Sequence, residues 1–142
     1  MAEPGLPSTG WGVNRVVVDT SVVSYLLKKH SLAARYWDHL EGRFLGISFM
    51  TVAELYRWPL VRGWGAKKVA ELREHLRSYV VLPYDDAMSW EWARLMSRKG
   101  RPMDHPDAWI AATALRYEAP LVTHNAQHFE GIEGLRIITE NT

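Results

Sequence analysis

Short runs of β-branched and aliphatic residues alternate along this chain with longer segments whose apolar residues recur at helical spacing. The first run, 16–18, is Val-Val-Val, which is typical of a central strand covered on both faces. Helical patterns follow from Thr20 and over Ala33 to Leu40, and Phe44 to Ser48 then reads as a second buried strand. Strands that alternate with helices predict an α/β fold with a mostly parallel sheet.

The rest of the chain continues the alternation. We expect further helices over 50–60, 69–79, 86–99 and 107–117, and further strands over 80–82, 120–123 and 135–139. The first of these helices is expected to be ended by Trp58-Pro59 and Gly63. The 142 residues fit one domain, and we divide them into a flexible leader rich in Pro, Gly and Ser (1–14) and a folded domain (15–142).

Composition limits the classes of function. The absence of cysteine excludes disulfides, thiol catalysis and Cys-based zinc sites. No apolar run reaches the roughly 20 residues of a membrane span, and the first residues lack the pattern of a signal peptide. We therefore expect a soluble cytoplasmic protein without a membrane partner. A formal net charge of only +1 means that any nucleic-acid affinity must come from local basic groups or bound metal.

Four acidic residues stand beside apolar runs. Asp19 follows the first strand, Glu54 lies within a helix, and Asp104 and Asp107 head the nearly apolar segment 108–115. The carboxyl ends of parallel strands form one edge of a sheet, where ligands bind. If folding gathers these acids there, a divalent cation is the usual way to offset their repulsion.

Each of these residues also has a purely structural explanation. Asp19, Asp104 or Asp107 can cap a helix, and Glu54 can face solvent or pair with Arg57 one turn on. Hydroxyls near the acids either hold metal-bound waters or serve as caps and turn donors: Thr20, Ser21 and Thr123. His105, His124 and His128 raise the alternative of zinc or a general base, but their spacing matches no zinc motif.

The ordered set of motifs resembles a PIN domain of the VapC toxin type. The resemblance rests on Asp-Thr-Ser at 19–21, on the helical Glu54, and on Asp107 before Ile-Ala-Ala-Thr-Ala-Leu at 110–115, and it covers Arg15 to Thr139. It implies a three-layer sandwich with a central sheet of four to five strands between helices. It also implies that Asp19, Glu54 and Asp107 are the catalytic, metal-holding acids.

Two further residues lie near this pattern. Asn125 stands where such chains carry a fourth Asp or an Asn, so we include it among the catalytic candidates. Asp104 is an additional carboxylate, which we include as a candidate metal ligand.

The resemblance implies a metal-dependent endoribonuclease that leaves 5′-phosphate and 3′-hydroxyl ends, acts as the toxin of a toxin–antitoxin pair, forms a homodimer and binds an antitoxin protein. A carboxylate site favours magnesium, with manganese possible. Arg57 and Arg101 are our candidates for contacts with RNA phosphates. One alternative is a catalytically weak PIN-like module that binds RNA or a protein partner. A weaker one is a phosphoacceptor domain that uses Asp19.

Overall fold

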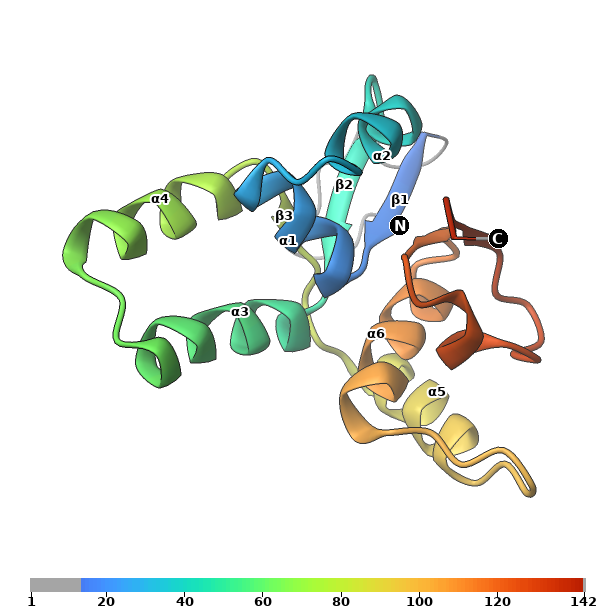
Figure 1. Cartoon of the computed structure of the whole chain (residues 1–142). Helices are drawn as coiled ribbons and strands as arrows, with labels where there is room; N and C mark the ends of the chain where they lie inside the picture. Colours follow the sequence, from blue (N-terminus) through green and yellow to red (C-terminus); the bar gives the residue numbers. More distant parts are fainter. Residues whose placement is uncertain (1–13, 142) are drawn as a thin grey trace.

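β1 (Arg15–Val18) lies at the centre of a five-stranded sheet, and each neighbouring pair of strands is parallel (Figure 1). The strand order is β3-β2-β1-β4-β5. The other strands are β2 (Phe44–Ile47), β3 (Val80–Val81), β4 (Leu121–Val122) and β5 (Ile137–Ile138). The computed structural model describes residues 14–141, so all but the last residue of the predicted leader lies outside the described residues. The predicted α/β class and the parallel sheet are confirmed.

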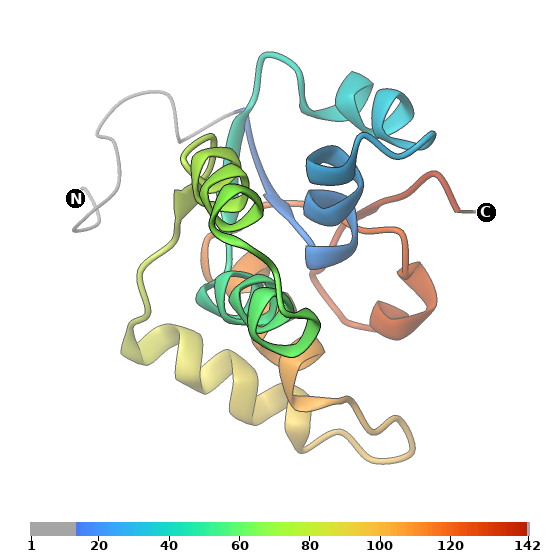
Figure 2. The ribbon, with the colours of Figure 1, turned by 60° about the vertical axis from the view of Figure 1, so that its left-hand side comes forward.

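Helices cover both faces of the sheet and make the three predicted layers (Figures 1 and 2). They are α1 (Thr20–Lys28), α2 (Ala33–Leu40), α3 (Phe49–Arg62), α4 (Ala66–Leu76), α5 (Asp86–Met96) and α6 (His105–Arg116), with a short 3₁₀ helix, η1 (Ala126–Phe129). None of the helices within residues 14–141 is both long and apolar enough to cross a membrane.

β1 divides the core, because successive side chains of a strand point to opposite faces. Val17 packs in one buried cluster with side chains of α5 and α6, whereas Val16 and Val18 pack in a second cluster with side chains of α1 to α4. All three valines are fully buried. The uninterrupted apolar run read from the sequence is therefore the signature of a strand with helices on both sides.

Two of the helix boundaries that differ from the predictions matter for the site. α3 continues through Pro59 to Arg62 and ends at Gly63, which has a positive φ of 65°. A proline removes one hydrogen bond of a helix without always ending it, and here the left-handed glycine supplies the end. α6 begins at His105 rather than at Asp107, so Asp104 takes the N-cap position and Asp107 lies in the first turn.

Candidate active site

Asp19 lies directly after β1 and caps α1. Its Oδ1 accepts a hydrogen bond from the Thr20 N–H at 2.8 Å, and its Oδ2 accepts bonds from Thr123 Oγ1 at 2.6 Å and Ser21 Oγ at 3.1 Å. The Asp19 N–H donates to the Val122 carbonyl, which ties the end of β1 to β4. Asp19 is only 4% exposed, so three neutral donors hold a nearly buried carboxylate at the carboxyl edge of the sheet.

Glu54 reaches the same region from α3. Its Oε1 accepts a hydrogen bond from Thr20 Oγ1 at 2.7 Å, and Thr20 Oγ1 also lies 2.9 Å from Thr51 Oγ1. Thr20 thus contacts Asp19 through its N–H and Glu54 through its hydroxyl. Glu54 is half-buried, and among the ion pairs of residues 14–141 none joins it to Arg57. The exposed Glu54–Arg57 pair considered from the sequence therefore does not form.

Asp107 and Asp104 approach from the start of α6. Asp107 Oδ2 lies 3.3 Å from Nδ1 of His128, a residue of η1, and the Asp107 side chain is 24% exposed. Asp104 is exposed and makes no side-chain capping bond. Capping therefore does not explain the Asp104 carboxylate, and Asp107 is free to face the pocket from inside the first turn.

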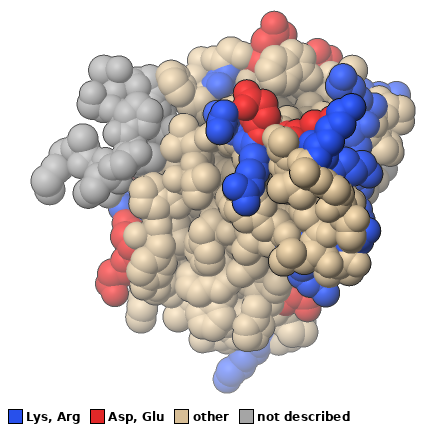
Figure 3. Space-filling model, turned by 90° about the vertical axis from the view of Figure 1, so that its left-hand side faces the viewer, with Lys and Arg blue, Asp and Glu red and all other residues tan. Residues whose placement is uncertain are grey.

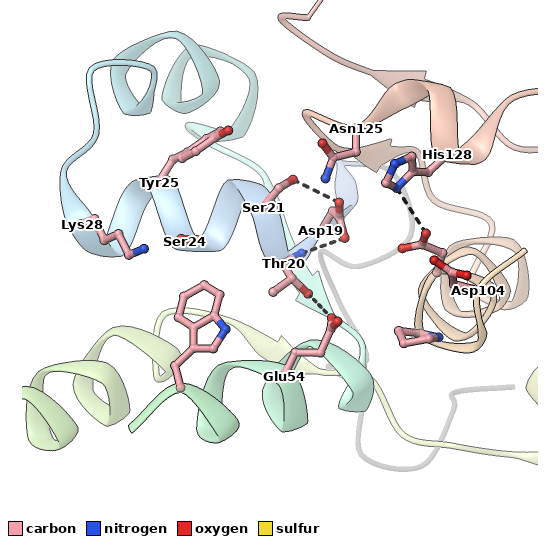
Figure 4. Close-up of a pocket in the computed structure, with 13 residues that line it drawn as sticks. Asp19, Thr20, Ser21, Ser24, Tyr25, Lys28, Glu54, Asp104, Asn125 and His128 are labelled. Atoms are coloured by element: carbon pink, nitrogen blue, oxygen red, sulfur yellow. Dashed lines mark hydrogen bonds and ion pairs between the residues drawn. The ribbon is translucent and has the colours of Figure 1, made fainter. Parts of the chain in front are cut away.

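One pocket of about 410 Å³ joins these groups (Figure 4). Its walls include all four acids singled out in the sequence, together with Thr20, Ser21 and Asn125. Figure 4 shows Asp19 and Glu54 on one side, Asp104 and His128 on the other, and Tyr25 and Lys28 farther along α1. Four carboxylates that are widely separated in the chain thus line a single hollow at the carboxyl edge of the sheet.

The electrostatics of the pocket disfavour ionised carboxylates. Burial raises the pKa of Asp19 above its usual value, against the hydrogen bonds from Thr123, Ser21 and Thr20. Burial also raises the pKa of Glu54, and the Asp19 charge adds to the effect. The pKa of Asp107 is raised to about 6. Burial is the largest cause and the Asp19 charge the next, whereas His128 opposes the shift. Such crowding is the situation in which a bound cation stabilises a site.

The structure also separates some of the predicted residues from the pocket. Thr123 lies behind Asp19 and supports it, since its hydroxyl donates to Asp19 and accepts from the Asn125 N–H at 3.0 Å. Arg57 and Arg101 are exposed, and neither lines the pocket. Arg101 lies instead beside Gly131. A Cβ added at this glycine would lie 2.5 Å from a guanidinium nitrogen of Arg101.

Several residues that line the pocket were not among the predicted site residues. They include Lys28, Trp58 and His128. Helical spacing could have predicted two of these three. Lys28 follows Ser21 by seven residues and Trp58 follows Glu54 by four, so each lies on the same helix face as a predicted site residue. His128 was considered only as a candidate zinc ligand or general base, and no local spacing could have placed it beside Asp107.

The histidines do not assemble the zinc site that was considered as an alternative. His124 Nδ1 lies 2.6 Å from the Tyr36 hydroxyl, and His105 packs edge-on against Trp92. Only His128 contacts an acid of the pocket. Among the residues that the structure describes, no three His, Asp or Glu side chains converge closely enough to enclose an ion by themselves.

This donor set fits a hard cation that keeps much of its water. Magnesium is held by one or two carboxylates and retains several waters, unlike zinc in a closed cage of side chains. The Asp19 charge raises the pKa of both Asp107 and Glu54, so these three carboxylates interact with one another. Thr20, Ser21 and Asn125 add neutral oxygen atoms to the wall.

A parallel α/β sandwich with a carboxylate pocket at the carboxyl edge of β1 defines the class of PIN-like domains. The chain belongs to the PIN domain family: the sequence pattern of the PIN domain matches residues 16–135.

Curated relatives agree with this placement. The chain is 30% identical over 126 residues to ribonuclease VapC1 of Haemophilus influenzae strain R2866, an alignment that covers 84% of this chain and 93% of the relative. It is 26% identical over 125 residues to the tRNA(fMet)-specific endonuclease VapC of Shigella flexneri, covering 86% and 95%. The resemblance to VapC proteins expected from the sequence is confirmed.

Solved structures give the same result. A chain in the structure of VapBC-1 from nontypeable Haemophilus influenzae matches with a TM-score of 0.73 and 27% identity over 88% of this chain and 97% of that chain. A chain in the DNA-bound VapBC from Salmonella typhimurium matches with a TM-score of 0.74 and 24% identity over 89% and 98%. At the latter level of identity the similarity shows the shared fold.

Proposed function

We propose that this chain is an endoribonuclease that hydrolyses RNA phosphodiester bonds and acts as the toxin of a toxin–antitoxin pair. The observation that carries the proposal is the gathering of Asp19, Glu54, Asp104 and Asp107 in one pocket. Burial raises the pKa of Asp19, Glu54 and Asp107, and the Asp19 charge adds to the shift of Glu54 and Asp107. The VapC relatives, named ribonucleases and endonucleases, supply the substrate class.

Asp19 and Asp107 are the residues proposed to hold a divalent cation, with Glu54 and Asp104 as further oxygen donors. Magnesium is the expected ion and manganese the substitute, because the described donors are all oxygen atoms apart from His128. When bound, such a cation polarises the scissile phosphate and lowers the pKa of a water.

The chain's own residues set the geometry of this site. Thr123, Ser21 and the Thr20 N–H fix the two Asp19 oxygens, and the Thr20 hydroxyl fixes Glu54. Asn125 offers an amide beside the acids without adding charge, which suits the positioning of a water. The products expected are a 5′-phosphate and a 3′-hydroxyl.

The proposed partners are an RNA substrate, an antitoxin and a second copy of the chain. One structural neighbour is titled a toxin–antitoxin complex from Klebsiella pneumoniae, and another a member of the VapBC family of toxin–antitoxin systems from Mycobacterium tuberculosis. Apolar side chains are exposed at the end of α3 and on α5, where Leu60 is 86% and Trp90 66% exposed. These surfaces are candidates for protein contacts.

The test is cleavage of a panel of single-stranded and structured RNAs by the purified chain. We expect magnesium-dependent cleavage that stops with a chelator and falls about 100-fold or more in Asp19→Asn, because replacing a metal ligand should cost at least as much as replacing the groups that support one. Asp38→Asn, an exposed site on α2, is the control and should cleave normally.

The second candidate, a catalytically weak binding module, is favoured by Asn125 in place of a fourth acid and by the absence of a tight three-ligand cluster in the described chain. A folded, magnesium-saturated protein that binds RNA but cuts no member of the panel would replace the first proposal with this one.

A further inference from the structure

A second pocket, of about 390 Å³, adjoins the acidic one. It is lined by Leu27, Lys28, Arg62, Trp64, Lys68 and Glu71, which come from α1, the end of α3 and α4 with the loop between them. Lys28 lines both pockets, so the two hollows share a wall. The second pocket therefore extends the first along the face formed by α1, α3 and α4.

Basic side chains in this pocket are seated on tryptophan rings. Lys28 Nζ lies 4.8 Å and Arg62 Cζ 4.9 Å from the centroid of the Trp58 ring, and Lys68 Nζ lies 4.9 Å from that of Trp64. A cation above an indole face is held there by the ring quadrupole. We call these three cations and two rings the cationic track.

The cations of the track keep their charge available to a ligand. Lys28, Arg62 and Lys68 are all exposed, and within residues 14–141 none forms an ion pair with a carboxylate. Figure 3 shows several Lys and Arg side chains in the upper part of the face at the α3–α4 end of the molecule, with Asp or Glu side chains among them. Glu71 also lines this pocket, but within the described chain no ion pair joins it to these cations. Prearranged cations without a direct carboxylate partner suit an extended anion.

The track begins at the acidic pocket. Glu54, Trp58 and Arg62 follow one another at four-residue intervals on α3, so they form one line along that helix. Glu54 and Trp58 line the acidic pocket, and Arg62 lines the second one. Along one helix the surface thus changes from carboxylate to indole to guanidinium.

We propose that the cationic track binds the backbone of single-stranded RNA on one side of the bond that is cut. This inference rests on the proposed function, and it names the path of the substrate. A scissile phosphodiester continues into nucleotides on both sides, and the wall that carries Asp104 and Asp107 repels neighbouring phosphates. A positive groove interleaved with aromatic rings is the usual platform for a single strand.

The decisive experiment measures RNA binding separately from cleavage. Asp19→Asn protein is mixed with a fluorescent single-stranded RNA. The fluorescence anisotropy gives the Kd of the complex at KCl concentrations from about 50 to about 400 mM. The test variant carries Lys28→Gln, Arg62→Gln and Lys68→Gln. The matched control carries Arg35→Gln, Arg43→Gln and Arg136→Gln, which are exposed and line neither pocket.

We expect the track variant to bind more weakly and its plot of log Kd against log salt to flatten by about 2, since each phosphate contact on a single strand contributes about 0.7 to the slope. The control should keep the slope of the parent. Equal losses in both variants, an unchanged slope in the track variant, or no RNA binding by the parent at low salt would each overturn the inference.

The same design separates this inference from the proposed function. Without the Asp19 substitution, a chain that binds RNA along the track but never cuts it would reject the nuclease and retain the track. A chain that cuts RNA with the same KM and salt dependence in the track variant would retain the nuclease and reject the track. Loss of antitoxin binding alone in the track variant would assign these cations to an acidic protein segment and reject the RNA path.

Discussion

Removing the charge of Asp107 should stabilise the protein when no metal is bound. In the fold, burial and the Asp19 charge raise the pKa of this carboxyl from 3.8 to about 6. A shift of this size corresponds to about 3 kcal/mol lost on ionisation. Because the side chain is 24% exposed and water screens part of the interaction, we expect Asp107→Asn to raise the free energy of unfolding by about 1–2 kcal/mol at pH 8.

The sign of the pH dependence follows from the raised pKa. The contribution of Asp107 to stability is fully present below its unfolded value of 3.8 and is lost as the pH rises through about 6. The advantage of Asp107→Asn should therefore be near zero at pH 4 and complete by pH 8. Loss of the contact with His128 offsets little, because a half-exposed ion pair contributes about 0–1 kcal/mol.

Urea unfolding in EDTA at several pH values measures this difference. Asp38→Asn removes the same charge from an exposed site and should change stability by less than about 0.5 kcal/mol throughout. With magnesium at 100 times its Kd the order should reverse, since binding adds about 2.7 kcal/mol to the parent alone. A variant that is less stable than the parent in EDTA at pH 8 would refute the view that these carboxylates crowd one another.

Two further predictions concern the supports of the fold and the site. Thr123→Val removes the hydroxyl that donates to Asp19 Oδ2; we expect a loss of about 1–3 kcal/mol in urea unfolding, whereas Thr123→Ser should stay near the parent, and equal losses would contradict this. Asp85 caps α5 through Met88 N–H and accepts from Arg116 Nε at 2.6 Å; Asp85→Ala should lower the free energy of unfolding by about 0.5–2 kcal/mol, and Asp85→Asn should lose less because an amide oxygen can still cap.

The sequence sufficed to predict those parts of the site that depend on strand ends and local motifs. Asp19 was placed by the apolar run before it, and Asp107 by the apolar helix after it. Parallel strands bring their carboxyl ends to one edge, so the meeting of these acids followed from the fold class. The contact of Thr123 with Asp19 spans 104 positions, and it was anticipated only as one of several hydroxyls near that edge.

The two arginines chosen for contacts with RNA phosphates, Arg57 and Arg101, do not line the acidic pocket, because they were chosen by their distance along the chain from the acids. Successive residues turn by about 100° on a helix, so Trp58 lies about 40° from Glu54 on α3 while Arg57 lies about 60° to the other side. Trp58 lines the pocket and Arg57 does not. Lys68 of α4 and Lys28 of α1 both line the second pocket. Helical periodicity alone does not predict that these two helices meet there.

The separation of cations from acids is consistent with the proposed metal site. Asp19 is nearly buried, yet its partners are two hydroxyls and an N–H rather than Lys or Arg. A neighbouring lysine would lower the pKa of Asp19 and stabilise the fold, but it would also neutralise the charge that attracts a divalent cation. Lys28 lies in the same pocket but over the Trp58 ring. The indole thus holds the Lys28 cation away from the carboxylates, which is the position that the proposed RNA path requires.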